Sequence, residues 1–296
     1  MSPRITVIIV SWNSREHVRG CLRALPAAIE DPQQLAIHVV DNASSDDTVA
    51  MLRAEFPPVT VHDPGENLGF ARANNLVLAR CSTEYALLLN PDTEPLRGSV
   101  ARLLAFMDAH PDAAAAGPLL VHPDLTPQAE SDRDPGLLRE FLGLPGVRSL
   151  RAFDRLRARL LYLPAAGEKP TPVECLTGAC LLVRRAAWEQ VGLLDEGFFL
   201  YYEDLDWCRR MRCAGWRLYR VPDARVIHYG GQSAARAGRR VHRAFFASRW
   251  RYFRKHRGPL AAAAIAVMNA LVEGGAAWKE RHRERQGAGR NRAPSK

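Results

Sequence analysis

The chain has 296 residues, of which 47% are apolar and 25% are charged, and its formal net charge is +9. This composition supplies enough apolar side chains for a buried core, so it excludes a disordered chain, a collagen-like fibre and a disulfide-stapled miniprotein. The charge is uneven, because residues 236–296 hold 16 Lys/Arg and 3 Asp/Glu whereas residues 1–235 hold 25 and 29. Such a basic tail favours an anionic partner, either a lipid surface or a nucleic acid.

Neither end of the chain is predicted to cross a membrane. The first apolar run, Ile5–Val10, is too short for a signal peptide. The longest apolar stretch, Pro259–Trp278, is interrupted by Asn269, Glu273 and two adjacent glycines, so we predict that it does not span a bilayer. The six cysteines form no C-x-x-C pair, which indicates free thiols in a reducing compartment.

The first 120 residues alternate between apolar β-branched runs and helical patterns. Strands are predicted at 5–10, 36–40, 59–61, 85–89 and 113–120, and helices around 18–25, 48–55, 71–80 and 99–109. Strands that alternate with helices imply βαβ units and a mostly parallel sheet covered on both faces. The strand runs are continuously apolar, as expected for strands that are buried on both sides.

The remainder of the chain divides into three parts. Residues 122–172 contain seven prolines and a basic amphipathic helix predicted around 148–163, which indicates a variable surface excursion. Order returns over residues 173–235, with strands predicted at 176–184, 216–221 and 224–228 and helices at 186–191 and 205–214. We therefore predict one α/β domain over residues 1–235, followed by a basic helical tail over residues 236–296.

Polar residues gather where the predicted strands end. Ser11-Trp12-Asn13, Asp41-Asn42 and Asn90-Pro91-Asp92 each follow a strand, and Glu66–Phe70 precedes a helix whose N-terminus is suited to phosphate. Neither G-x-G-x-x-G after the first strand nor G-x4-G-K-[ST] is present, so dinucleotide and P-loop sites are excluded. A nucleotide site built from acidic strand ends remains.

Six segments of the chain, taken in their order along the sequence, resemble family 2 glycosyltransferases of the inverting GT-A class, and especially the rhamnosyltransferase-like branch. The resemblance covers about residues 5–255 and rests on the segments Ile8–Asn13, Val39–Thr48, Asn67–Ala71, Leu88–Thr93, Thr177–Ala179 and Phe198–Asp206. It implies a GT-A fold, which is a Rossmann-like α/β domain with a mostly parallel central sheet.

The resemblance also implies which residues bind the donor. Asp41 resembles the Asp that reads the nucleobase, with Ser11 and Asn13 near the nucleoside. By the same likeness, the ribose and phosphates would lie near Asn67, Gly69 and Arg72, at the start of the third predicted helix.

Three further matches concern metal and catalysis. Asp92 matches the last position of the family's D-x-D metal motif, although Asn90 stands at the first position. Glu203-Asp204 matches the E-D pair that supplies the catalytic base, and His228 matches a late histidine that some members place on the metal. The chemistry fits these residue types, because a divalent cation neutralises a diphosphate leaving group and one carboxylate takes the proton of the acceptor hydroxyl.

These matches predict an inverting transferase that depends on Mn²⁺ or Mg²⁺ and uses a dTDP- or UDP-linked sugar, with deoxysugars such as rhamnose favoured. The expected acceptor is a glycan or a lipid-linked sugar of cell-surface polysaccharide synthesis. The expected location is cytoplasmic and peripheral, with residues 236–296 on the anionic inner face of the membrane.

Other interpretations stay open for individual residues and for the whole chain. Asp204 opens a predicted helix, where an acidic residue is favourable anyway, Asp41 is suited to capping a turn, and His228 to a buried structural role. A nucleotidyltransferase would need a Gly-rich loop that Arg4–Asn13 lacks. A nucleic-acid-binding protein is suggested only by the aromatic and basic tail, without a recognised motif, so no nucleic-acid partner is predicted.

Overall fold

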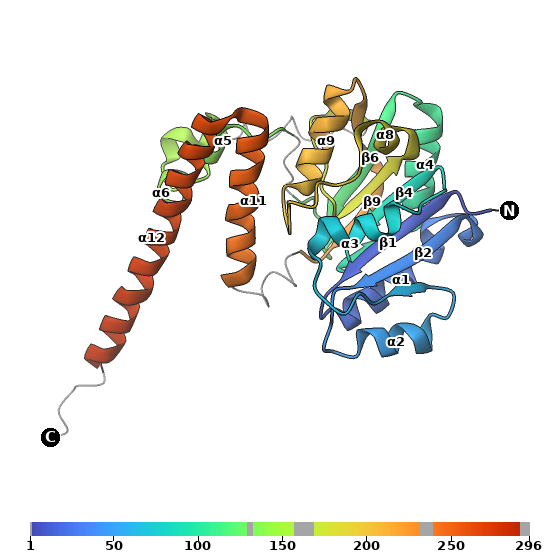
Figure 1. The fold of residues 1–296 in the computed structure, drawn as a ribbon, viewed down its shortest axis with the longest axis horizontal. Helices are drawn as coiled ribbons and strands as arrows, with labels where there is room; N and C mark the ends of the chain where they lie inside the picture. Colours follow the sequence, from blue (N-terminus) through green and yellow to red (C-terminus); the bar gives the residue numbers. More distant parts are fainter. Residues whose placement is uncertain (1, 129–132, 157–168, 231–238, 291–296) are drawn as a thin grey trace. The chain divides into compact units, whose positions relative to one another are not determined.

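The computed structural model describes residues 2–128, 133–156, 169–230 and 239–290. Its contacts divide the chain into two compact units, and Figure 1 shows the ribbon of each. The first unit comprises Met1–Asp134 with Arg159–Ser248, and the second comprises Pro135–Ala158 with Arg249–Lys296. The second unit therefore joins part of the proline-containing excursion to the basic tail.

A single sheet organises the first unit, with the strand order β3-β2-β1-β4-β8-β6-β9-β5. The first four strands in this order run parallel to one another, as predicted. They are β1 (Ile5–Ser11), β2 (Leu35–Asp41), β3 (Thr60–His62) and β4 (Tyr85–Leu89). The register of β1 and β2 pairs Ser11 with Asp41, so two predicted site residues end their strands side by side.

The second half of the sheet mixes both directions. Its strands are β5 (Thr93–Pro95), β6 (Ala113–Val121), β7 (Thr171–Val173), β8 (Cys180–Arg184) and β9 (Arg217–His228). β8 runs antiparallel to both of its neighbours, β6 runs parallel to β9, and the short strands β5 and β7 are antiparallel to β9.

Helices cover both faces of this sheet (Figure 1). One face packs against α1 (Arg15–Ala28), α2 (Thr48–Glu55) and α4 (Ser99–Ala109). The other face packs against α3 (Gly69–Leu78), α8 (Arg185–Val191) and α9 (Glu203–Cys213). Within β1, Val7 and Ile9 belong to the first layer and Ile8 to the second, which explains why a strand buried on both sides has a continuously apolar sequence.

Four predicted elements differ clearly from the structure. The strands predicted at 216–221 and 224–228 form the single strand β9, whose register against β6 shifts next to Pro222, a residue without an amide hydrogen. The strand predicted to start at Leu176 begins only at Cys180. The helix predicted around 148–163 is interrupted at its start, where α6 (Pro145–Arg148) ends and the 3₁₀ turn Arg151–Phe153 follows. Residues 154–156 are helical, as predicted, and residues 157–168 lie outside the described ranges.

The second unit consists of α5 (Leu137–Leu142), α6, the last residues of α11 (Arg239–Arg257) and α12 (Pro259–Arg290). A buried polar contact connects these helices, because Arg249 forms an ion pair with Glu140 at 2.9 Å and donates a hydrogen bond to the Asn269 side chain at 2.9 Å. Among the helices of the described ranges, none is long and apolar enough to cross a bilayer.

Candidate active site

A cavity of about 600 Å³ lies at the carboxyl ends of β1 and β4 in the first unit. Ligands of open α/β sheets bind at this edge. Five of the predicted site residues line the cavity: Ser11, Asn67, Gly69, Asp92 and His228. The structure also places Trp12, Asn42, Phe70, Thr177, Phe199 and Tyr201 along its wall, none of which sequence reasoning had assigned to a ligand.

Asp92 and His228 come together through the short strand β5. β5 follows Asp92 directly and pairs with the end of β9, so that Thr93 lies opposite His228. The backbone amide of Tyr229 donates to the Asp92 carbonyl at 2.9 Å, which fixes the two segments side by side. Asp92 Oδ1 then lies 3.6 Å from His228 Nε2, and the Asp92 residue is only 7% exposed.

Gln128 orients the His228 ring, and nothing in its sequence context indicated this role. Its side-chain amide donates to the backbone carbonyl of His228, and its Oε1 lies 3.0 Å from His228 Nδ1. Because that amide oxygen only accepts, Nδ1 carries a proton, and in the neutral ring Nε2 then presents its lone pair toward Asp92. Asp92 Oδ1 and His228 Nε2 would then both be acceptors, and a cation bound between them would stabilise their close approach.

This donor set fits a divalent cation held partly by substrate. Carboxylate oxygen suits Mg²⁺ and Mn²⁺, and an imidazole nitrogen is better tolerated by Mn²⁺. Among the described residues there is no cluster of three or more His, Cys, Asp or Glu side chains that could enclose a metal. Asp92 and His228 would therefore leave several coordination positions to other oxygen atoms, such as those of a diphosphate.

The two carboxylates of the E-D pair lie at the start of α9, and neither is among the residues that line the cavity. Tyr201 and Tyr202 precede them with φ angles of 69° and 68°, a conformation that costs about 1–3 kcal/mol for a residue other than glycine and that clusters at functional sites. This turn sets the direction in which α9 begins. The Asp204 carboxylate accepts the backbone amides of Gly178 at 2.9 Å and Leu205 at 2.8 Å.

Glu203 and Asp204 differ in how their charge is stabilised. Burial raises the pKa of both carboxyl groups, and the neighbouring Asp204 raises the pKa of Glu203 further. The two amide hydrogen bonds oppose this shift at Asp204, whereas Glu203 Oε2 is buried without a hydrogen-bond partner in the described residues. Asp204 is therefore the member of the pair that carries the negative charge more readily. Asp206, two residues after Asp204, is fully buried in an ion pair with Arg210.

Gly69 allows two segments of the wall to approach each other closely. Its φ of +77° favours glycine, and a Cβ atom there would overlap the carbonyl oxygen of Phe199. The next amide, that of Phe70, donates to this same carbonyl at 2.8 Å. Asn42 stabilises the turn that contains Gly69. Its side-chain amide donates a hydrogen bond to the Gly69 carbonyl and accepts one from the backbone amide of Leu68, each at 3.2 Å.

Replacing Gly69 by Ala is accordingly expected to destabilise the fold and to displace the Phe199 segment. Gly65→Ala is the matched control, since Gly65 has a φ of +75° and no atom within 4 Å of its Cβ position. Gly65→Ala should cost about 1–2 kcal/mol for the backbone conformation alone. Gly69→Ala should cost at least about 1–3 kcal/mol more because of the steric overlap. Urea unfolding of both variants measures the difference; equal free energies of unfolding would show that the contact is unimportant.

Three predicted donor-binding residues are not part of the cavity lining. Both carboxylate oxygens of Asp41 accept hydrogen bonds from Ser44, at 2.8 and 2.6 Å, so Asp41 caps the turn after β2. Asn13 Oδ1 accepts the backbone amide of Ser45 at 2.7 Å. Arg72 is exposed and lies 3.6 Å from Glu66. Their contacts with a nucleotide stay predictions.

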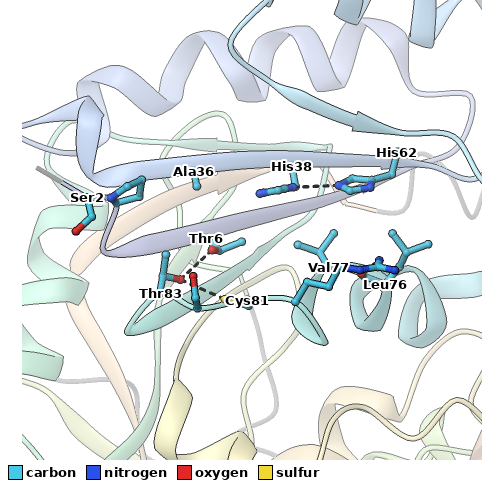
Figure 2. A pocket seen from close by; sticks show the side chains of 12 residues that line it. Ser2, Thr6, Ala36, His38, His62, Leu76, Val77, Cys81 and Thr83 are labelled. Atoms are coloured by element: carbon cyan, nitrogen blue, oxygen red, sulfur yellow. Dashed lines mark hydrogen bonds between the residues drawn. The ribbon is translucent and has the colours of Figure 1, made fainter.

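A second cavity of about 450 Å³ lies beside the first residues of β1 and β2, and Figure 2 shows the side chains that line it. Two histidines on neighbouring strands face each other there, with His38 Nδ1 3.0 Å from His62 Nε2 and the rings stacked at 5.3 Å (Figure 2). One ring must donate and the other accept, so the pair is stable when at least one of the facing nitrogens lacks a proton. Burial lowers the pKa of both histidines.

The lowered pKa values predict that stability decreases as the pH falls. An unfolded histidine takes up a proton near pH 6.5, whereas the folded pair resists protonation, so the stability present above pH 6.5 is progressively lost below it. The double variant His38→Gln/His62→Gln should show a shallower loss between pH 7.5 and 5 in urea unfolding. His242→Gln, at an exposed position, is the control. Parallel curves for the wild type and the double variant would contradict this expectation.

The sequence matches the family model described as Glycosyl transferase family 2 over residues 6–192. A relative from Mycobacterium tuberculosis, named N-acetylglucosaminyl-diphospho-decaprenol L-rhamnosyltransferase, is 31% identical over 251 residues, which cover 80% of this chain and 79% of the relative. Rhamnosyltransferase WbbL of Escherichia coli is 26% identical over 259 residues, which cover 85% and 90%.

A solved structure confirms the predicted fold class. The mannosyltransferase PcManGT from Pyrobaculum calidifontis, in complex with GDP-Man and Mn²⁺, superposes with a TM-score of 0.57 at 17% identity. The superposition covers 94% of this chain and 81% of the mannosyltransferase. The α/β domain described above therefore has the GT-A fold.

Proposed function

The chain belongs to glycosyltransferase family 2, and from this membership we propose that it transfers a deoxysugar, foremost L-rhamnose, from a nucleotide diphosphate donor to a lipid-linked or glycan acceptor. The observation that carries the proposal is the cavity of about 600 Å³ that holds Asp92 and His228 beside the ends of β1 and β4. Rhamnosyl transfer is the activity that the names of both relatives state.

The names of the relatives favour particular substrates. Two relatives found in different bacteria are rhamnosyltransferases, and one acts on an N-acetylglucosaminyl-diphospho-polyprenol. We therefore favour dTDP-L-rhamnose as the donor, with UDP-linked sugars next, and a polyprenol-linked sugar as the acceptor. A lipid-linked acceptor agrees with peripheral attachment of the basic residues 236–296 to the inner face of the cytoplasmic membrane.

Asp204 is the proposed general base. The acceptor hydroxyl attacks the anomeric carbon on the side opposite the diphosphate, its proton passes to the Asp204 carboxylate, and the bond to the diphosphate breaks, which inverts the configuration. The carboxylate is held in place by the amide of Gly178, which lies between the wall residues Thr177 and Ala179. When it is ionised, Glu203 adds a second negative charge beside Asp204, and it is the alternative general base.

Asp92 and His228 are the proposed ligands of a divalent cation, with Mn²⁺ favoured over Mg²⁺. When bound, such a cation neutralises the oxygens of the diphosphate and so makes it a better leaving group. Gln128 holds the His228 ring in the tautomer that leaves Nε2 free, and outer partners of this kind typically contribute about 10–100-fold to metal affinity.

A donor screen by thermal shift tests the proposal. The full chain is heated with dTDP-, UDP- and GDP-linked sugars, each with Mn²⁺ and with EDTA, because a ligand that binds only the folded state raises the melting temperature. We expect the largest shift with dTDP-L-rhamnose and Mn²⁺. A shift with a nucleoside triphosphate but with no nucleotide sugar would favour the nucleotidyltransferase alternative instead.

A further inference from the structure

The first half of α12 exposes an apolar face that none of the described residues of its unit covers. Ile265 is fully buried, whereas Leu260, Val267 and Leu271 are 87%, 61% and 64% exposed. At 3.6 residues per turn, the spacings of seven and four residues place these three side chains on one side of the helix, which we call the α12 stripe. No charged residue occurs from position 259 to position 272, so the stripe continues for about four turns without a charge.

The opposite side of α12 already has its partners within the second unit. Ile265 and Asn269 are buried, and the Asn269 side chain accepts the hydrogen bond of Arg249, which in turn pairs with Glu140. The helix is thus anchored to α11 and α5 by one side. The α12 stripe faces away from these contacts and is left for an external partner.

Exposed apolar side chains are concentrated in this unit. Most of the large apolar side chains that are exposed among the described residues belong to it, although it is the smaller of the two units. Besides the α12 stripe they are Leu137, Leu138, Phe141, Leu150, Leu156 and Trp250. Apolar surface of this extent marks a contact with another molecule or with a membrane.

The net positive charge of the second unit favours an anionic partner. Residues 135–158 and 249–296 hold 17 Lys/Arg and 5 Asp/Glu, whereas the rest of the chain holds 24 and 27. A second copy would bring together two surfaces of net charge +12, which repel each other. A surface of anionic lipid attracts the same charges and accepts apolar side chains at the level of its headgroups.

We propose that the α12 stripe inserts into the interface of an anionic bilayer, with α12 lying along the membrane surface. The charge-free segment of 14 residues is shorter than the roughly 20 residues needed to cross the hydrocarbon core, so it lies in the interface rather than through it. This inference deepens the peripheral attachment proposed above, because it assigns binding to three apolar side chains as well as to the basic charge.

Sedimentation of the full chain with phosphatidylglycerol vesicles and with neutral phosphatidylcholine vesicles tests the proposal. The test variant is Leu260→Gln/Val267→Gln/Leu271→Gln, which removes the stripe without changing charge or helix propensity greatly. The matched control is Ala263→Gln/Ala266→Gln/Ala270→Gln, at three exposed positions of the same helix. We expect the wild type and the control to sediment with the anionic vesicles and the test variant to bind at least about tenfold more weakly.

Two results would overturn the proposal. One is equal binding of the wild type and the test variant to the anionic vesicles. The other is a wild-type dimer in light scattering that the test variant converts to monomers, which would assign the stripe to a second copy. Circular dichroism checks that the helices persist. Donor binding measured without vesicles should be the same in all three proteins, so a failure of membrane docking is distinguished from a failure of the proposed sugar transfer.

Discussion

Asp204→Asn is expected to lower turnover by at least about 10²-fold while donor binding stays nearly unchanged. The substitution removes the carboxylate that is held by the amides of Gly178 and Leu205 and therefore removes the proton acceptor. Single-turnover kinetics give the chemical step, and calorimetry with the nucleotide gives the binding constant. Because burial raises the pKa of Asp204, activity of the wild type should also fall on the acidic side as this carboxylate becomes protonated.

Glu203→Gln is the matched variant that separates the two carboxylates. It keeps the size of the side chain and leaves Asp204 with its two amide hydrogen bonds. We expect a smaller loss of turnover than in Asp204→Asn, because Glu203 Oε2 has no hydrogen-bond partner in the described residues and its pKa is raised well above the usual value. A larger loss in Glu203→Gln, together with near-normal turnover in Asp204→Asn, would move the role of base to Glu203.

Asp92→Asn is expected to weaken Mn²⁺-dependent binding of the nucleotide diphosphate by at least about 10–100-fold. The carboxylate lies 3.6 Å from His228 Nε2, and the substitution removes the charge that would hold the cation there. Gln128→Leu should weaken binding to a lesser degree, because the His228 ring loses its hydrogen bond at Nδ1. Gln33→Leu, at an exposed position, is the control.

Calorimetry with Mn²⁺ and with EDTA measures this effect. In the wild type, EDTA should weaken nucleotide binding to about the level of Asp92→Asn, and that variant should no longer respond to EDTA. Wild-type binding that is equal with Mn²⁺ and with EDTA would contradict the assignment of both Asp92 and His228. Normal metal dependence in Gln128→Leu would show that the ring keeps its orientation without this side chain.

Much of the α/β alternation can be read from the sequence because each strand is a run of apolar residues that ends at a polar one. The run Tyr85–Leu89 and the helix Ser99–Ala109 have the predicted bounds in the structure. Strand direction cannot be read in the same way, since a doubly covered run such as Cys180–Arg184 has the same pattern whether it is parallel or antiparallel. β8 accordingly proved antiparallel to both neighbours.

Two of the predicted site residues, Ser11 and Asp92, line the cavity because a strand end decides the position of each side chain. The residues that sequence reasoning missed depend on contacts between distant segments. Gln128 lies 100 positions from His228 and carries no local signal. Phe199 reaches the cavity because its carbonyl bonds the amide of Phe70. Trp12, which directly follows β1, also lines the cavity wall.

Mass spectrometry of an acceptor lipid tests sugar transfer most directly. The full chain is incubated with an N-acetylglucosaminyl-diphospho-polyprenol, dTDP-L-rhamnose and Mn²⁺, with Asp204→Asn as the inactive control. The predicted result is an acceptor that gains one deoxyhexose in the wild type and none in the variant, with inverted configuration at the new linkage by nuclear magnetic resonance. An acceptor that stays unmodified with every nucleotide sugar that binds the chain, or a linkage of retained configuration, would contradict the proposed inverting transfer.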